Sequence, residues 1–544
     1  MSESIEREIR SKLKSLLNEM GIEDIEINLE IPRNPDHGEL STNVALLATK
    51  QAKKPPREIA NQIAKNYPID NDNVAAVEIA GPGFINFRLT PSYFHRLLKE
   101  ILANPSAFGS SDDGAGERWL FEFVSANPTG PLNIVSARAA SIGDTMTRVF
   151  RKRGYDAASE FYVNDGGNQV QLLGASVRAR IEQIKANAET AEIPENGYHG
   201  EYVLDIARLW LEDFPGENIP ADLHLGRWAA AQNRDDQEKV LHSFGVDFDR
   251  WFRESELYAD SRADKVVDEL ASRELTYESE DALWFKASEF GDDEDRVLKK
   301  ANGDYTYVVP DIAYHLDKRN RGYNVAVDLL GPDHHGYVKR MEAALAALGV
   351  PKDFLKVLLV QQVNLKRDGV EVKMSKRAGI GITLIELMNE VDVDAARFFF
   401  LLRKISSPLD FDIDLARRHT EENPVYYIQY AHARIMSILR QPQAVAPADD
   451  TDLSVLVESE EFAVLRALAR YPWTLAAIVR NVEPHPLTAY LMDLAKTFHH
   501  FYAHHRVITE DVKLTAARLM LCQGVAAMLR EGLAMMGVSA PERM

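Results

Sequence analysis

The chain has 544 residues, 45% of them hydrophobic and 27% charged, which is enough apolar sequence for several domains. Its net charge of -20 argues against nucleic-acid binding by whole-chain attraction, and its single cysteine, Cys522, excludes a disulfide framework or a cysteine-based zinc cluster. The longest apolar runs, such as 355–360, are strand-sized, and the N-terminus lacks a signal-peptide core. We therefore expect a cytoplasmic protein. The basic segments 148–154, 316–322 and 373–377 remain candidate contacts for a folded RNA.

Residues 1–110 predict a small α+β domain. An amphipathic helix opens it, and an irregular stretch leads to a helix over 43–66 that is broken near its Lys-Lys-Pro-Pro sequence. Two strands follow, at 74–80 and 83–89. The Gly- and Asp-rich segment 110–117 is the clearest domain boundary in the chain.

Residues 117–390 predict an α/β domain with a Rossmann-like, doubly wound parallel sheet. A strand at 118–125, a glycine-containing turn, a helix over 135–153 and a strand at 158–165 form a βαβ unit. Residues 170–275 are mostly helical and polar, as expected of a helical insertion, and strand–helix alternation then resumes. A parallel sheet of this kind binds its ligand at the carboxyl ends of the strands.

The C-terminal part predicts an all-α bundle over 391–544, because the strand signals stop near residue 390. Just before it, the Asp-Gly pair in LKRDGVEVKMSKR (365–377) indicates a hairpin that ends in a cationic loop. Lys373, Lys376 and Arg377 in that loop could clamp a polyphosphate as charge develops in a transition state.

Several motifs together resemble one family. EFVSANPTGPL (122–132), KMSKR (373–377) and APERM (540–544) look like a class I aminoacyl-tRNA synthetase, and specifically a bacterial-type arginyl-tRNA synthetase. GPGFINFRL (81–89) resembles its N-terminal tRNA-binding domain, and NPVYYIQYAHARI (423–435) the start of its anticodon-binding bundle. The resemblance runs over nearly the whole chain.

The resemblance implies a ligase reaction and its partners. Arginine would be activated with ATP and Mg²⁺ to arginyl-adenylate and then transferred to the 3' end of tRNA(Arg), by a cytoplasmic monomer. The three domains would be an elbow-recognition domain (1–110), the catalytic domain (117–390) and an anticodon-binding domain (391–544). Whether activation requires tRNA is a separate question that one chain does not answer.

The resemblance also implies roles for individual residues. Glu254 and Asp311 would bind the guanidinium, which needs carboxylates in fork geometry, and Tyr307, four residues before Asp311, would face the same pocket. Glu122 and Asn127 would bind the polar head of the amino acid, and Asp333 could pair with its ammonium group. The residues implied for ATP are Pro131, Asn133, Val135, Ser136, Lys373, Met374, Ser375 and Lys376, with Asn133, Ser136, Lys373 and Lys376 as the catalytic set.

One motif departs from the family pattern. PTGPL is normally followed by His-x-Gly-His and Gly-Arg-Gly, whereas this chain reads Asn133 to Ser136 and then Ala-Arg-Ala. Asn and Ser can each donate a hydrogen bond and are good N-cap residues, so we expect the helix start and its anion-binding amides to survive. Val135 replaces a glycine that lets adenine lie on bare backbone, so we expect a differently shaped ATP subsite.

Other candidates concern tRNA and metals. Tyr427, Tyr430 and Arg434 share one helical face and could stack unpaired anticodon bases; the alternative is bundle core. Phe84 and Asn86 would contact the tRNA elbow, or else fill a β-edge core position. His500 and His504 lie four residues apart without an acidic or cysteine partner nearby, so we expect no structural zinc. His334 and His335 lie at a strand end, for either substrate contact or packing.

Two other functions fit parts of the sequence. A catalytically silent, tRNA-binding paralogue would explain the altered phosphate motif. A small-molecule adenylyltransferase would explain the ATP motifs but leaves about 110 N-terminal and 150 C-terminal residues without a role. The intact KMSKR loop and pocket acids favour an active arginyl-tRNA synthetase over both.

Overall fold

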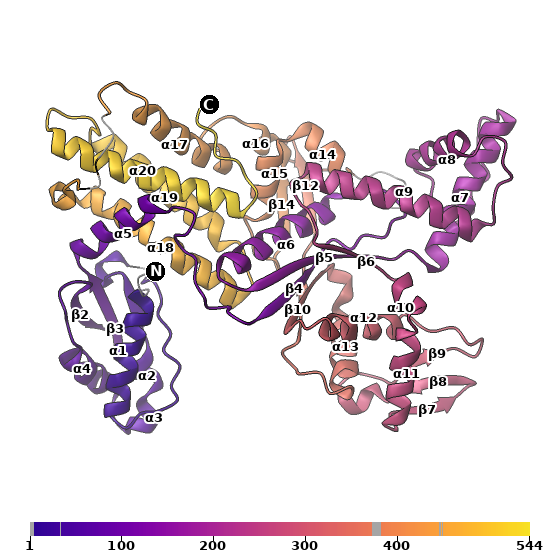
Figure 1. The fold of residues 1–544 in the computed structure, drawn as a ribbon, viewed down its shortest axis with the longest axis horizontal. Helices are drawn as coiled ribbons and strands as arrows, with labels where there is room; N and C mark the ends of the chain where they lie inside the picture. Colours follow the sequence, from indigo (N-terminus) through magenta and orange to yellow (C-terminus); the bar gives the residue numbers. More distant parts are fainter. Residues whose placement is uncertain (1–4, 33, 373–381, 445–447, 449) are drawn as a thin grey trace.

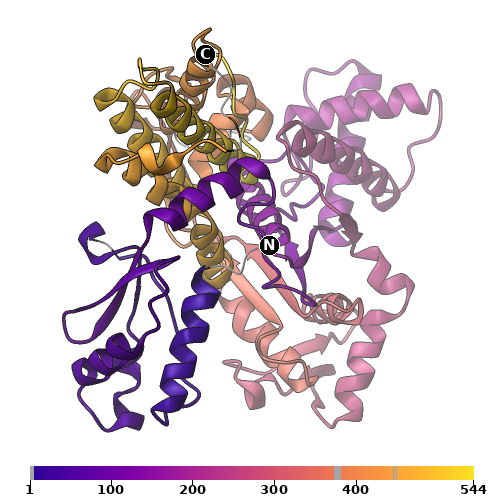
Figure 2. The same cartoon turned by 60° about the vertical axis from the view of Figure 1, so that its left-hand side comes forward.

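The computed structural model describes residues 5–32, 34–372, 382–444, 448 and 450–544. The N-terminal domain lies at one end of an elongated molecule and the helices α7, α8 and α9 lie at the other, with the parallel sheet between them (Figure 1). The C-terminal helices pack above the sheet, beside the N-terminal domain, as the turned view also shows (Figure 2).

The N-terminal domain packs helices on a three-stranded antiparallel sheet of order β1-β3-β2. Its elements are α1 (Ile5–Glu19), β1 (Leu40–Thr42), α2 (Val44–Leu47), α3 (Thr49–Ala52), α4 (Pro56–Asn66), β2 (Val74–Ala80) and β3 (Phe84–Leu89). The predicted helix, its break before Pro56 and both predicted strands are confirmed. The three-residue β1 is an addition, since its stretch was expected to be irregular.

The central sheet has five parallel strands in the order β11-β10-β4-β5-β6. They are β4 (Arg118–Glu122), β5 (Asp156–Val163), β6 (Arg250–Arg253), β10 (Val325–Leu330) and β11 (Leu355–Leu359). Helix α6 (Ile134–Lys152) covers one face, and α12 (Val308–Asn320) and α13 (His335–Ala347) cover the other (Figure 1). This confirms the doubly wound parallel fold, and its switch point lies between β4 and β10.

The stretch 170–275 differs in part from the expected helical insertion. Helices α7 (Gly167–Ala186), α8 (Glu201–Asp213) and α9 (Asp222–Ser243) do form a unit with its own apolar core. However, β6 is a strand of the central sheet and pairs with β5. Its four residues, Arg-Trp-Phe-Arg, are too few to show a hydrophobic period in the sequence. The strand forms because β5 supplies its hydrogen-bonding partners. Beyond it lie α10 (Ser255–Ala259), α11 (Arg262–Ser272) and an antiparallel sheet of β7 (Thr276–Ser279), β8 (Ala282–Phe285) and β9 (Arg296–Lys299).

The predicted Asp-Gly hairpin is confirmed. β12 (Val363–Arg367) pairs antiparallel with β13 (Val370–Glu371), and Asp368 and Gly369 both have positive φ, at 51° and 73°, as a type I′ turn requires. The expectation that strands stop near 390 is wrong: β14 (Leu409–Asp412) pairs parallel with β12. The strand is short, and its partner lies more than 40 residues away in the chain.

The C-terminal bundle contains α17 (Pro424–Leu439), α18 (Ser459–Asn481), α19 (Pro486–His504) and α20 (Val512–Met535), preceded by α14 (Leu384–Glu390), α15 (Val393–Phe400) and α16 (Ile413–Arg417). Helix α5 (Pro91–Ala103), expected in the N-terminal domain, packs against α18 and α20 (Figure 2). Helices α18 and α20 are long and apolar enough for a membrane span, but their apolar windows are 56% and 72% buried inside the protein. Such burial is typical of core helices.

Candidate active site

Three neighbouring strands each place a buried acid toward α12. Glu122 of β4 lies beside Glu160 of β5 and Asp328 of β10 in strand register. Lys318 Nζ donates to Glu122 at 2.6 Å and to Asp328 at 2.7 Å, while Arg321 forms a bidentate pair with Glu160. The row lies at the carboxyl side of the switch point, where doubly wound sheets bind their ligands.

The two predicted guanidinium-binding acids lie close enough to interact with each other and with Glu122 of this row. Tyr162 donates from its hydroxyl to Glu254 at 3.0 Å, and Glu254 is 9% exposed. Burial raises the pKa of Glu254. Burial also raises the pKa of Asp311 to about 7, an effect that His315 opposes and the Glu254 and Glu122 carboxylates reinforce. Two acids that resist ionisation together are suited to a ligand that brings positive charge.

The other predicted arginine contacts are less enclosed. Tyr307 is the N-cap residue of α12, and its carbonyl accepts from the Asp311 amide at 3.4 Å, so the two residues share a helical turn as predicted; the Tyr307 side chain is 73% exposed. Asn127 is exposed and its amide donates to Gln169 of α7 at 2.7 Å. Asp333 is exposed in a short 3-10 turn after β10.

Asn133 caps α6 with its side chain. Its Oδ1 accepts from the amides of Val135 and Ser136, both at 3.0 Å, and from the Ser136 hydroxyl at 3.3 Å. The predicted helix start is therefore confirmed. Of the anion-binding amides expected at this helix start, those of Val135 and Ser136 are occupied by the cap itself.

The turn before α6 is supported from both sides. On one side, Gln237 of α9 donates to the carbonyl of Gly130 at 2.8 Å, and Tyr202 of α8 donates to that of Thr129 at 2.7 Å. On the other, Asn133 forms an isolated bridge with Thr383, just after the KMSKR segment. Pro131 is exposed and Val135 is half-buried. Lys373, Met374, Ser375, Lys376 and Arg377 lie outside the described residues.

The predicted tRNA residues divide into exposed and buried ones. Phe84 is 38% exposed at the start of β3, whereas Asn86 is buried and accepts from Ser41 at 2.7 Å. On α17, Tyr430 lies parallel to Tyr426 with an interplanar angle of 5°, and Arg434 lies 4.6 Å from the Tyr430 ring centre. Tyr427 packs on His499 at 4.8 Å. Tyr427, Tyr430 and Arg434 are half-buried, an exposure that fits both predicted roles, stacking on anticodon bases and packing in the bundle core.

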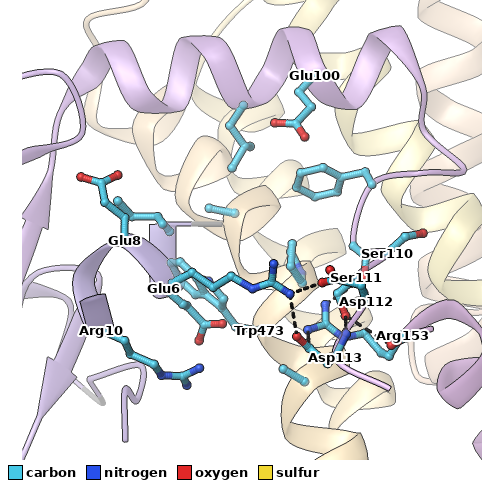
Figure 3. A pocket seen from close by; sticks show the side chains of 18 of the residues that line it. Glu6, Glu8, Arg10, Glu100, Ser110, Ser111, Asp112, Asp113, Arg153 and Trp473 are labelled. Atoms are coloured by element: carbon cyan, nitrogen blue, oxygen red, sulfur yellow. Dashed lines mark hydrogen bonds and ion pairs between the residues drawn. The ribbon is translucent and has the colours of Figure 1, made fainter. Parts of the chain in front are cut away.

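A large hollow lies elsewhere. About 1210 Å³ opens between α1, α5, the linker 104–113 and α18, with Arg153 and Arg7 paired to the linker acids Asp112 and Asp113 (Figure 3). Arginines and acids alternate around it, so its lining selects no single charge. The hollow is a seam between domains, remote from the carboxyl ends of the sheet.

Comparison with known proteins identifies the family. The model for the arginyl tRNA synthetase N terminal domain matches residues 3–89, and that for the DALR anticodon binding domain matches residues 428–544. The arginine–tRNA ligase of Symbiobacterium thermophilum is 44% identical over 527 residues, covering 95% of this chain and 94% of that protein. This chain belongs to the arginyl-tRNA synthetases.

Two further relatives agree over the full length. The arginine–tRNA ligase of Geobacillus thermodenitrificans is 42% identical over 553 residues, covering 100% of this chain and 99% of that protein. The structure of Thermus thermophilus arginyl-tRNA synthetase superposes with a TM-score of 0.80 at 21% identity, covering 99% of this chain and 100% of that one, which supports the fold. Within this synthetase family the chain is an aminoacyl-tRNA ligase.

Sequence reasoning missed the cations behind the synthetase pocket. His315 and Lys318 follow Asp311 at i+4 and i+7 of one helix, a spacing that places all three on one face. This helical spacing was the signal in the sequence that could have linked His315 and Lys318 to Asp311. Their acidic partners Glu122 and Asp328 are 196 and 10 residues away from Lys318, and only the folded sheet brings them together.

Proposed function

We propose that this chain activates L-arginine with Mg²⁺-bound ATP and transfers the arginyl group to tRNA(Arg). The acidic pocket of Glu254 and Asp311 carries the proposal. A guanidinium is always charged and offers planar donors, so two adjacent carboxylates match it in both charge and shape. Tyr162 orients one of these acids through its hydroxyl.

The ATP subsite would lie at the turn 128–136, next to this pocket. Asn133 Oδ1 is occupied by the helix cap, so its amide nitrogen is the group left to donate to a phosphate. The bridge between Asn133 and Thr383 brings Thr383, which follows the KMSKR segment in the chain, to the same turn. Lys373 and Lys376 would supply positive charge as pyrophosphate leaves.

The remaining domains would bind tRNA. The exposed Phe84 would contact the elbow, and the α17 rings would receive anticodon bases. We assign residues 1–110, 117–390 and 391–544 to elbow recognition, catalysis and anticodon binding. We further propose a cytoplasmic monomer.

The test is arginine-dependent ATP–pyrophosphate exchange, with and without tRNA, beside a charging assay. We expect exchange with arginine and charging of tRNA(Arg). Exchange with a different amino acid and no tRNA requirement would instead identify an adenylyltransferase.

One observation favours a second candidate, the silent tRNA-binding paralogue. The Asn133 cap occupies two of the first amides of α6, which weakens the usual anion site of a helix N-terminus. Under that candidate, tRNA would bind while both exchange and charging are absent. The same two assays, with a tRNA-binding measurement, therefore separate the candidates.

A further inference from the structure

His315 is a buried side chain whose two ring nitrogens both meet oxygen atoms. Nδ1 lies 2.7 Å from the Asp311 carbonyl oxygen, and Nε2 lies 2.7 Å from Asp328 Oδ2. A carbonyl oxygen can only accept, so Nδ1 must carry a proton. The side chain is 1% exposed, so bulk solvent does not reach these contacts.

The second nitrogen must also carry a proton if Asp328 is ionised. Asp328 Oδ1 accepts from the Lys318 ammonium at 2.7 Å, and although burial raises the pKa of Asp328, the Lys318 charge opposes it and the net pKa lies well below its ordinary value. An ionised carboxylate accepts only, so Nε2 donates as well. This assignment, made from the hydrogen-bond partners, describes an imidazolium.

The imidazolium lies one helical turn behind the pocket acid. Asp311, His315 and Lys318 share one face of α12, so the positive charge lies on the same helix face as Asp311 and lowers the pKa of its carboxyl. The other charged or titratable groups that face Asp311 come from β4, β5, the β6–α10 segment and α13: Glu122, Tyr162, Glu254, Tyr258, Tyr337 and Arg340. Arg340 lowers the pKa of Asp311, as His315 does. The carboxylates of Glu122 and Glu254 raise that pKa.

We propose that His315 is a positioning residue for arginine specificity: held between Asp328 and the Asp311 carbonyl, its positive charge favours the ionised form of Asp311, the form that pairs with a cationic side chain. The inference rests on the proposed function, because Asp311 must be a contact of the arginine guanidinium. His315 itself is enclosed and touches no substrate. It acts through Asp311, and Asp328 acts through His315.

The experiment measures kcat/KM for arginine between pH 6 and 9 in the full-length enzyme with tRNA present. His315→Gln keeps a donor toward Asp328 and removes the charge. We expect the acid limb of the profile of kcat/KM against pH to move up by about one pH unit. At pH 7 the arginine KM then rises about fivefold and at pH 9 it approaches that of the wild type, while the ATP KM stays unchanged.

A second variant tests the partner acid. Asp328→Asn removes the carboxylate that holds the second His315 proton, so its acid limb should also move up, and the double variant should shift no further than His315→Gln alone. His432→Gln is the matched control, since His432 is also 1% exposed but lies on α17. Its acid limb should stay at the wild-type pH.

The outcomes separate the two claims. If wild-type enzyme shows neither exchange nor charging, the proposed function is wrong. If wild type is active and His315→Gln and Asp328→Asn keep its acid limb and arginine KM, only the role of His315 is overturned. A variant that unfolds is replaced by its partner, because either single variant removes the His315 charge and should move the acid limb of the pH profile up.

Discussion

Burial raises the pKa of Asp311 to about 7, and the Glu254 and Glu122 carboxylates add to the effect of burial. The ordinary pKa of an aspartate is 3.8, so the free enzyme holds this acid partly protonated at neutral pH. The folded state binds the extra proton, and an entering cation would stabilise the ionised form further. Arginine binding should therefore involve release of a proton.

The first prediction follows from the raised pKa of Asp311. As pH falls through about 7, Asp311 becomes protonated and kcat/KM for arginine should fall, because the guanidinium stays charged throughout. Asp311→Asn should abolish this acid limb and lower kcat/KM at pH 8 by at least about thirtyfold. Asp293→Asn, at an exposed acid paired with Lys339, is the control. An unchanged limb in the Asp311 variant would assign the titration to another group.

The second prediction concerns Asn133, whose two ends have separate roles. Asn133→Ser keeps an oxygen that can cap α6, so Tm should stay near that of the wild type. It loses the amide donor, so pyrophosphate exchange should slow by about a hundredfold if that donor contacts the phosphates. Asn133→Ala should lower both Tm and exchange. Wild-type exchange by the Ser variant would show that the amide donor has no phosphate contact.

Helix α17 illustrates the scale of the element. Its N-cap Asn423 accepts from the amides of Val425 and Tyr426, and Pro424 occupies the first turn. The start of the helix is therefore determined by neighbouring residues in the sequence. Its tyrosines follow the helical period, which predicts a shared face. Whether that face meets RNA or protein depends on the neighbouring α19, whose His499 contacts Tyr427 and Tyr430.

The third prediction tests this face. Tyr430→Ala removes a ring that lies parallel to Tyr426 and under Arg434, so the tRNA Kd should rise by about five- to a hundredfold. Tyr430→Phe keeps the ring and should bind within a few-fold of the wild type. Fluorescence anisotropy with labelled tRNA provides the measurement. If the Ala variant binds tRNA normally but melts earlier, the ring belongs to the bundle core.

Across the whole molecule, Arg397 of α15 joins three regions. Fully buried, it donates to the carbonyls of Met536 at 2.7 Å and Phe244 at 3.0 Å and pairs with Asp144 of α6. Gly537 packs directly on the guanidinium, with no room for a Cβ. The Arg397 guanidinium thus holds together the sheet domain, the end of the helical insertion and the C-terminus.

The fourth prediction is a loss of stability without loss of the active-site groups. Arg397→Met leaves Asp144 short of a partner and two buried carbonyls unpaired, so unfolding should be easier by about 3–5 kcal/mol. Arg148→Met removes the more exposed partner of Asp144 and should cost under about 1 kcal/mol. Urea unfolding of both variants measures the difference. Equal effects would mean that burial contributes little here.

The sequence by itself determined the elements that carry their own signal. Helix α6, the Asp-Gly hairpin and the strands β2 and β3 were predictable because period, caps and turn residues are local. The family was also readable, from motifs that keep their order along the chain. Each of these features depends on residues close together in sequence.

Only the tertiary structure decided the rest. Strands β6 and β14 are four residues long and exist through hydrogen bonds to β5 and β12. Lys318 bridges Glu122 and Asp328 because two parallel strands meet in register beneath α12. Short strands and buried ion pairs depend on distant partners, so their stability comes from contacts that no local pattern contains.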